Sequence, residues 1–264
     1  MTVDEALTIA REAIPAAEAR LLLGFVLGRP RAWLAAHGEA VLDEAQARAF
    51  AGMAARRVAG EPVAYLVGRR EFYGREFGVA PGVLIPRPET ELLVEVGLAH
   101  ADGRILDLGA GSGCVAVTLA LEISGAAVTA VDVSPAALAV ARENAARLGA
   151  AVEFVESDWF SAVSGAFDLV VANPPYVAEG DPHLDELRFE PMGALVSGAD
   201  GLDAIRRIVA EAPRHLEPGG WLFLEHGYDQ ADAVRGLLDA AGFVDIEQHL
   251  DIAGIVRVSG GRRF

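Results

Sequence analysis

The sequence predicts an α/β protein with a mainly parallel seven-stranded sheet whose last strand is antiparallel, plus a small N-terminal helical domain. Apolar residues recur at helical spacing near the start, and strands alternate with helices after residue 88. The final two strands lie too close together for a helical crossover, so they should pair antiparallel. We therefore expect a helical domain over residues 1–70, a β-hairpin linker over 71–87 and an α/β domain over 88–264.

The N-terminal domain contains amphipathic segments. Apolar residues recur at spacings of three and four in "VDEALTIAREAI", "AAEARLLLGFVLG" and "DEAQARAFAGMAARRVAG", and glycines and prolines separate these stretches. The following "REFYGREFGVAPGVLIPRP" places aromatic and β-branched residues around glycines. This pattern predicts a short hairpin between the two domains.

The α/β domain begins with a helix at Pro88, a residue suited to the first helical position. The predicted strands are, in order, "RILDLGA", "AVTAVDV", "VEFVES", "FDLVVAN", "WLFLEHG", "FVDIEQHL" and "IVRVS". The predicted helices between them cover 114–121, 135–149, part of 201–216, and 229–241. Alternation of this kind predicts a parallel sheet covered by helices on both faces.

The charge pattern excludes several functions. All 22 basic residues are arginines, which excludes a P-loop lysine and a Schiff-base lysine. The net charge is −16, and 28 of the 38 acids but only 12 of the 22 arginines follow residue 80. Such a surface repels phosphate backbones, so we expect no direct nucleic-acid partner. With no apolar run of about 20 residues and no basic leader, we expect a cytoplasmic protein without a membrane partner.

Neither cysteine nor histidine indicates a metal site. Cys114 stands alone, so no internal disulfide forms; its place at a helix start could lower the thiol pKa, but a small core residue fits better. The histidines show no ligand spacing, and we predict no bound metal. They are His37, His100, His183, His215, His226 and His249.

A glycine-rich turn follows the first strand of the predicted sheet, in "LDLGAGSGCVAV". Ligands bind beyond the carboxyl ends of parallel strands, and Gly109, Gly111 and Gly113 let a ligand approach the backbone closely. Taken alone, the turn fits tight packing equally well. Its spacing differs from the G-x-G-x-x-G of dinucleotide sites, and Asp107 would repel a pyrophosphate but hold an ammonium group. The pattern favours a cationic nucleoside such as S-adenosylmethionine.

Acids at the ends of the next two strands support a nucleoside site. Asp132 can accept two hydrogen bonds from a ribose diol; it could instead cap the next helix, although Ser134 fits that cap better. Asp158 could receive an adenine amino group while Trp159 flanks the ring. A plain acidic turn is the alternative at these last two positions.

The fourth strand ends in "NPPY", which predicts a clasp for a planar NH2 group. Pro174 holds Asn173 extended, so the side-chain carbonyl of Asn173 and the backbone carbonyl of Pro174 can accept both amide hydrogens. Tyr176 supplies an aromatic face. Two such acceptors favour the pyramidal nitrogen of a methyl-transfer transition state over the flat ground state. The alternative is a rigid strand exit.

Six segments together resemble the HemK/PrmC family of protein-(glutamine-N5) methyltransferases. They are "LIPRPETELLVE", "DLGAGSGCVAV", "VDVS", "NPPYV", "EPMGALVSGADGLD" and "DIAGIVRVSGGRR". The resemblance implies a class I methyltransferase (Rossmann-like) fold, S-adenosyl-L-methionine as cofactor and S-adenosyl-L-homocysteine as product. It also implies a target, the glutamine of the Gly-Gly-Gln motif in class I peptide chain release factors.

The resemblance also assigns residues to roles. The helical domain would bind the release factor, and the residues at the cofactor would line its methionine part, ribose and adenine in turn. The cofactor-binding residues would be Asp107, Gly109, Ala110, Gly111, Ser112, Gly113, Asp132, Asp158, Trp159 and Asn173. The catalytic and substrate-binding residues would be Asn173, Pro174, Pro175 and Tyr176. Glu190 and Pro191 would border the substrate channel, and Ile255 departs from the family's usual polar residue in the tail. Apart from the resemblance, Arg87 and Glu89 lie near the linker and could border the active site, although ordinary helix-start chemistry explains them nearly as well.

Other functions stay open on the sequence alone. A related class of enzyme methylates a glutamine of a ribosomal protein, and the catalytic loop does not separate the two. An adenine N6-methyltransferase shares NPPY but conflicts with the charge. An NAD-dependent oxidoreductase would have to tolerate Asp107. A non-catalytic binding protein fits poorly with an intact NPPY. We expect a monomer.

Overall fold

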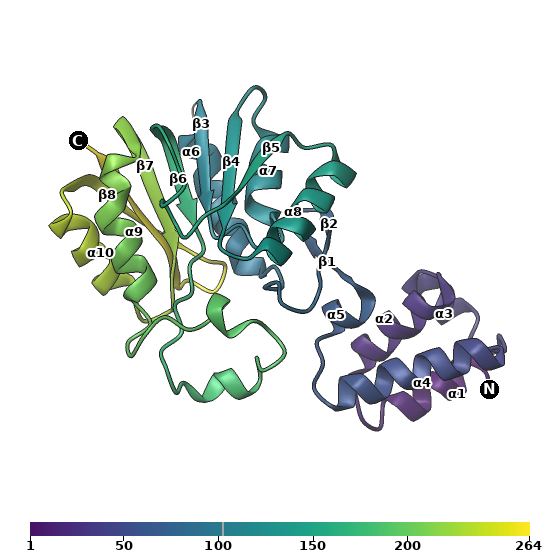
Figure 1. Cartoon of the computed structure of the whole chain (residues 1–264). Coiled ribbons are helices and arrows are strands. Elements are labelled where there is room, and N and C mark those ends of the chain that lie inside the picture. Colours follow the sequence, from purple (N-terminus) through teal and green to yellow (C-terminus); the bar gives the residue numbers. More distant parts are fainter. Residues whose placement is uncertain (102) are drawn as a thin grey trace. The chain divides into compact units, whose positions relative to one another are not determined.

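The computed structural model describes residues 1–101 and 103–264, and these fold into two compact units, Met1–Arg69 and Arg70–Phe264 (Figure 1). Each unit has its own hydrophobic core. In the part of the chain so described, no helix is both long enough and apolar enough to cross a bilayer.

The first unit is helical. Its helices are α1 (Val3–Ala10), α2 (Ala16–Leu27), α3 (Arg31–Ala36), α4 (Glu44–Val58) and α5 (Val63–Val67). Side-chain caps start two of them, because Thr2 accepts from the Glu5 amide at α1 and Asp43 accepts from the Gln46 amide at α4. The prediction of α1, α2 and α4 is confirmed. The short α3 and α5 were not predicted, since one or two turns give too few apolar repeats to detect.

A two-stranded hairpin opens the second unit. Strands β1 (Arg69–Phe72) and β2 (Arg75–Gly78) pair with each other, which confirms the predicted hairpin in that stretch. The rest of the predicted linker, residues 79–87, is not strand. That segment instead forms a wall of the pocket described below.

The remainder of the second unit is an α/β sheet structure. Its helices are α6 (Glu91–His100), α7 (Cys114–Glu122), α8 (Pro135–Leu148), α9 (Asp203–Glu211) and α10 (Ala231–Ala240). Its 3-10 turns are η1 (Pro88–Thr90), η2 (Pro182–Asp185), η3 (Met192–Ala194) and η4 (Ala212–Arg214). Its strands are β3 (Arg104–Leu108), β4 (Ala127–Asp132), β5 (Val152–Glu156), β6 (Phe167–Ala172), β7 (Leu216–Glu225), β8 (Phe243–Leu250) and β9 (Val256–Arg263).

In the described residues these strands form one seven-stranded sheet of order β5-β4-β3-β6-β7-β9-β8. The five strands from β5 to β7 are parallel to their neighbours. Strand β9 runs antiparallel to both β7 and β8. The predicted sheet, with its antiparallel last strand, is confirmed.

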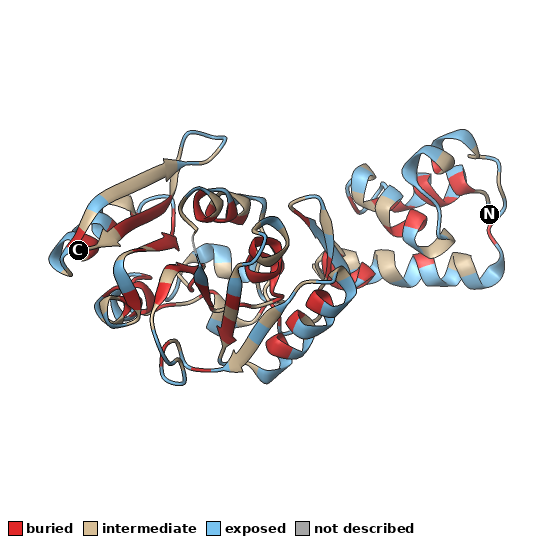
Figure 2. Cartoon of the chain, turned by 90° about the horizontal axis from the view of Figure 1, so that it is seen from above, coloured by how far each residue is buried: buried red, intermediate tan, exposed pale blue. Residues whose placement is uncertain are grey.

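Successive residues of the central strands face opposite layers. Ile105 shares a buried cluster with residues of α6 and α7, whereas Leu106 shares another with residues of α9 and α10. Figure 2 shows buried residues, in red, both in strands and in helices. A side chain of this kind contributes roughly 1.5–3 kcal/mol when fully buried. The sheet is therefore held rigidly from both faces, as the unbroken apolar runs of its strands predict.

The winding of the sheet reverses between β3 and β6. Strands β4 and β5 extend the sheet on one side of β3, and β6 and β7 extend it on the other. Leu108 pairs with Ala172, so the two strands end at the same level. The glycine turn after β3 and the NPPY segment after β6 thus leave the sheet side by side, where open α/β sheets bind ligands.

Candidate active site

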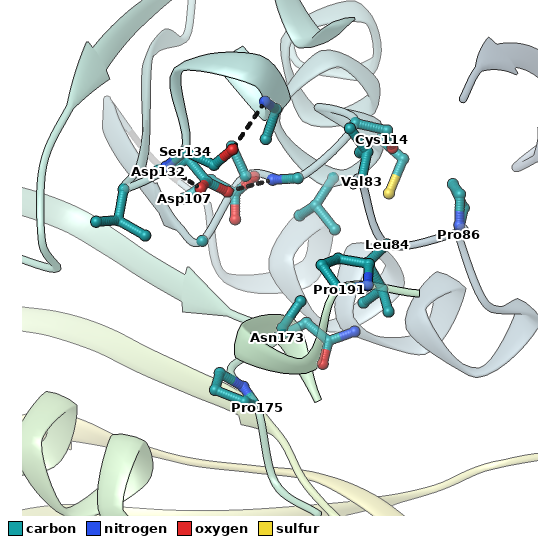
Figure 3. Close-up of a pocket in the computed structure, with 18 of the residues that line it drawn as sticks. Val83, Leu84, Pro86, Asp107, Cys114, Asp132, Ser134, Asn173, Pro175 and Pro191 are labelled. Atoms are coloured by element: carbon teal, nitrogen blue, oxygen red, sulfur yellow. Dashed lines mark hydrogen bonds between the residues drawn. The ribbon is translucent and has the colours of Figure 1, made fainter. Parts of the chain in front are cut away.

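A pocket lies at this reversal point, beyond the carboxyl ends of β3, β4 and β6 (Figure 3). Figure 3 shows Asp107, Asp132 and Ser134 on one side of it and Asn173 with Pro175 on another. Residues 82–87, together with Pro191, Gly193 and Ala194, complete its walls. The lining residues that sequence reasoning named are Arg87, Asp107, Gly109, Ala110, Gly111, Ser112, Asp132, Trp159, Asn173, Pro175 and Pro191.

The glycine turn is held open by its backbone. Gly109 has a positive φ of 76°, and its amide donates to the Val131 carbonyl at 2.8 Å. A Cβ atom at this position would lie 3.5 Å from the Trp159 ring and 3.9 Å from the Asn173 carbonyl oxygen. Only glycine adopts this conformation without strain and leaves the space over the turn free for a ligand.

Asp132 connects two loops of the pocket. Its Oδ2 accepts from the Gly111 amide at 2.8 Å and its Oδ1 accepts from the Ser134 amide at 2.8 Å (Figure 3). Ser134 in turn caps α8 by accepting from the Ala137 amide, so the predicted cap is confirmed. A carboxylate has about four acceptor positions, and Asp132 therefore keeps capacity for a ribose diol.

Asp107 is a buried acid at the floor of the pocket. It is 2% exposed and accepts a hydrogen bond from the Ala116 amide at 3.1 Å. Burial raises the pKa of Asp107 to about 7; the Ala116 bond opposes this shift and the charge of Asp132 adds to it. An ammonium group in the pocket would reverse the effect of burial by pairing with the carboxylate.

Cys114 lines the pocket as a thiol. It is buried, and burial raises the pKa of the Cys114 thiol to about 12. The alternative considered from sequence, a reactive thiolate at the start of α7, is therefore wrong.

Trp159 and Asp158 follow β5 and point to different neighbours. Trp159 has a positive φ of 51° and lines the pocket next to Gly109. The Asp158 carboxylate lies outside the pocket lining and forms a two-pronged ion pair with Arg207, both distances being 2.8 Å. The structure thus places the Trp159 indole in the pocket and directs the Asp158 carboxylate toward α9. Spacing along the sequence does not reveal that Arg207 is the partner of Asp158.

Asn173 lines the pocket from the NPPY segment and has a fixed orientation. Its Nδ2 donates to the Thr90 hydroxyl oxygen at 3.0 Å. Within the described residues its Oδ1 has no donor, and neither has the Pro174 carbonyl oxygen. Two acceptors are therefore left at this strand end, as the sequence predicts for a clasp on an NH2 group.

Besides Asp158, three predicted site residues are absent from the pocket lining formed by the described residues: Gly113, Pro174 and Tyr176. Tyr176 instead donates its hydroxyl proton to Glu225 Oε1 at 3.2 Å, and its carbonyl accepts from Gln230. Burial raises the pKa of the Tyr176 phenol, and the neighbouring Glu225 charge adds to this shift. The predicted contact between the Tyr176 ring and a substrate stays a prediction, and in this structure the Tyr176 side chain packs outside the pocket lining.

Sequence reasoning missed two parts of this site. Thr90 lines the pocket from the end of η1. Glu225, at the end of β7, lies outside the pocket lining. The wall formed by residues 82–86 is held by Glu190, which accepts from the Ile85 amide at 3.0 Å and pairs with Arg87 at 2.5 Å. A buried acid closing a hydrophobic strand, as in "WLFLE", was the available signal for Glu225.

The donor set fits S-adenosylmethionine. Asp107 offers a buried carboxylate to an ammonium group, and burial of that charge is favourable only with a cationic partner. Asp132 offers acceptors to a ribose, and Trp159 offers an aromatic face. The pocket that Gly109 lines together with these groups leaves room for a ligand between them.

Two family models match the chain. Residues 4–68 match the model described as PrmC N-terminal domain, and residues 88–187 match the one described as Methyltransferase small domain. These ranges correspond to the helical unit and to the part of the sheet unit that carries the pocket.

Curated relatives match along nearly the whole chain. The "Release factor glutamine methyltransferase" of Bordetella pertussis is 51% identical and covers 96% of this chain and 97% of its own length. The protein of the same name from Burkholderia pseudomallei is 53% identical over 94% of this chain and 92% of its own length. Among solved structures, a 16S rRNA methyltransferase of T. thermophilus in complex with AdoMet and guanosine has the same fold, with a TM-score of 0.56. That match has 24% identity and covers 74% of this chain and 50% of the other.

Proposed function

The chain belongs to the release factor glutamine methyltransferase family, and on that premise we propose that it methylates the N5 amide nitrogen of a release factor glutamine. The enzyme is S-adenosylmethionine-dependent, as its fold and relatives indicate. The proposed acceptor is the glutamine of the Gly-Gly-Gln motif in class I peptide chain release factors. Since these factors act in translation, the proposed place of action is the cytoplasm.

The observation that supports this proposal best is the position of Asn173. It follows β6 at the level where the glycine turn follows β3, and its amide nitrogen is bound to Thr90. Its Oδ1 and the Pro174 carbonyl oxygen therefore remain as acceptors for the two hydrogens of one primary amide. A carboxamide nitrogen held by both hydrogens points in a single direction.

The chain's own contribution to the reaction is orientation and electrostatics. When bound, S-adenosylmethionine supplies an electrophilic methyl group. Asn173 and Pro174 would hold the glutamine nitrogen and stabilise its pyramidal, partly positive form more than the flat amide. Holding both reactants in line gives an advantage of up to about 7–11 kcal/mol at ideal alignment. The amide proton can leave to water after transfer, so no strong base is required of the chain.

The helical unit is the proposed binding site for the body of the release factor. Its match to the PrmC N-terminal domain model supports this role, since that unit lies outside the sheet that carries the pocket. The two proposed acceptors at the end of β6 would recognise any primary amide, so selection of the release factor has to come from another part of the chain. The helical unit is proposed for that role.

A substrate pair tests the proposed function. Purified release factor should accept labelled methyl groups from S-adenosylmethionine, whereas the same factor with Gly-Gly-Gln changed to Gly-Gly-Glu should accept none, since a carboxylate has no nitrogen to methylate. Scintillation counting after gel separation measures this. Equal labelling of both proteins would refute the proposed acceptor.

The affinity for S-adenosylmethionine should fall as the pH falls through 7. The pKa of Asp107 is raised to about 7, so its carboxylate is mostly ionised at pH 7.5 and mostly neutral at pH 6, where it no longer attracts an ammonium group. We expect the Kd to rise roughly five- to tenfold between these two values. Isothermal titration calorimetry at each pH measures it.

Asp107→Asn provides the matched comparison. This variant should bind the cofactor weakly at both pH values, with no change between them, because the amide does not titrate. Asp158→Asn, at an exposed position on Arg207, should keep the wild-type pH dependence. A variant at Asp107 that retains the full pH dependence would show that another group causes it.

A further inference from the structure

A chain of buried polar side chains leads from strand β7 to the amide of Asn173. We propose that Thr90 and Glu225 are positioning residues for methyl transfer, which hold the Asn173 side chain with its oxygen toward the substrate amide. This inference rests on the proposed function of Asn173 as an acceptor for that amide.

Three separate elements converge to form this chain. Strands β6 and β7 are parallel and pair Ala172 with Leu224, so Asn173 and Glu225 leave neighbouring strands at one level. Thr90 reaches them from the end of η1. Asn173 Nδ2 donates to Thr90 Oγ1 at 3.0 Å, and Tyr176 donates to Glu225 Oε1 at 3.2 Å. The Thr90 hydroxyl is also near enough to the Glu225 carboxyl to lower its pKa.

The direction of these hydrogen bonds follows from the chemistry of a carboxylate. An ionised Glu225 can only accept, so its interaction with the Thr90 hydroxyl favours the orientation in which the Thr90 proton points toward the carboxylate. The lone pairs of Thr90 Oγ1 then face Asn173, which must present its NH2 group to them. The two ends of an amide are opposite, and Asn173 Oδ1 is therefore directed away from Thr90 and left for a ligand.

Burial of the Glu225 carboxylate and the Thr90 hydroxyl lowers the stability of the folded protein. Thr90 is 2% exposed and Glu225 is 1% exposed, and Glu225 Oε2 has no hydrogen-bond partner within residues 1–101 and 103–264. A buried, incompletely satisfied carboxylate destabilises a protein, while a neutral side chain of similar shape would not. The charge at Glu225 is thus better accounted for by orientation of its neighbours than by stability.

The protonation state of Glu225 gives this inference a pH signature. Burial raises the pKa of Glu225 to about 7; the bonds from Thr90 and Tyr176 oppose that shift, as does the charge of Arg257, while the charge of Glu89 adds to it. A protonated Glu225 can donate to Thr90, which frees the Thr90 proton. The Asn173 amide can then turn over so that its Oδ1 accepts that proton and no longer faces the substrate. Turnover at saturating cofactor and substrate should therefore fall as the pH drops below about 7.

Two substitutions at Thr90 test the role of its hydroxyl. Thr90→Val has the same shape without the hydroxyl and should lower kcat about 10- to 30-fold while the cofactor Kd stays within about threefold. Thr90→Ser keeps the hydroxyl and should recover kcat to within about threefold of wild type. The matched control is Thr118→Val, which removes a buried hydroxyl that donates to the Cys114 carbonyl in α7, away from the pocket lining formed by the described residues, and should keep kcat.

A double substitution separates positioning from general damage. If Thr90 acts through Asn173, then adding Thr90→Val to Asn173→Ala should lower kcat by no more than about twofold beyond Asn173→Ala alone. Glu225→Gln should lower kcat and abolish its decline below pH 7, because the amide does not titrate. Each variant is tested for folding by its melting temperature and by cofactor binding.

The outcomes distinguish this inference from the proposed function. If the wild-type enzyme does not methylate the release factor, the proposed function fails. If it does, but Thr90→Val retains wild-type kcat or multiplies the loss of Asn173→Ala, the positioning role is refuted. If kcat of Glu225→Gln still declines below pH 7 as in the wild type, the positioning role of Glu225 is refuted. The Thr90 variants then decide the positioning role of Thr90 alone.

Discussion

The Asn173→Ala variant is expected to lose about 10²–10³-fold in kcat. Its affinity for S-adenosylmethionine should change by less than about threefold, since Asp107 and Asp132, the residues proposed to hold the cofactor, remain in the pocket lining. The reason is that Asn173 Oδ1 is one of two acceptors left at the end of β6, and the interaction it would make strengthens only as the substrate nitrogen becomes pyramidal. Removing an interaction made in the transition state lowers kcat rather than ground-state binding.

Single-turnover methyl transfer and cofactor titration on the same preparation measure the two effects of Asn173→Ala. The melting temperature serves as the control for folding, because Asn173 is only half-buried and truncation should not disrupt the core. A loss of cofactor affinity equal to the loss of turnover would contradict the assigned role and point to a general collapse of the pocket.

The Asp132→Ala variant is expected to show the reverse pattern. Its cofactor Kd should rise about 100-fold, whereas kcat at saturating cofactor should stay within about fivefold of wild type. The substitution removes the acceptors proposed for the ribose, and it also releases the Gly111 and Ser134 amides that the carboxylate holds at 2.8 Å. Two effects therefore combine to raise the Kd: the ribose loses its proposed acceptors, and the glycine turn loses the carboxylate that holds it in place.

Asp132→Asn provides a graded comparison, since it keeps one carbonyl oxygen of the same shape. Its Kd should lie between wild type and Asp132→Ala, roughly tenfold above wild type. Fluorescence of Trp159, which lines the pocket, offers a convenient titration signal. If Asp132→Ala bound the cofactor normally, the ribose would have to be held elsewhere.

The sequence predicted every strand of the main sheet, and most predicted boundaries differ from the observed ones by no more than two residues. The end of β9 and the start of β7 differ by more, each for a physical reason. Strand β9 extends through Gly260 and Gly261 to Arg263, although paired glycines usually indicate a loop. A Cβ atom at Gly260 would lie 2.1 Å from the Phe223 ring, so this glycine permits close packing against β7. Strand β7 begins at Leu216, before Pro218, because Leu216 pairs with Phe167 across an irregularity in register.

For the site, residues that lie within one motif were predicted better than residues that assemble across elements. The glycine turn, Asp132 and Asn173 line the pocket because each follows a parallel strand, and strand ends meet at one edge. Thr90 and Glu225 come from η1 and β7, and no spacing in the sequence connects them. Likewise nothing local indicated that Arg207 would hold Asp158.

The reversal in the winding of the sheet separates two proposed roles. One half of the sheet, the donor half, would bind the nucleoside that donates the methyl group, and the other, the acceptor half, would bind the amide that accepts it. Strands β3, β4 and β5 end in the loops proposed to bind the nucleoside. Strands β6 and β7 end in the groups proposed to bind and orient the substrate amide. The halves meet along a single seam between β3 and β6. A scaffold divided in this way can be retargeted in evolution through its acceptor half alone, because new loops beyond β6 and β7 leave the donor half intact.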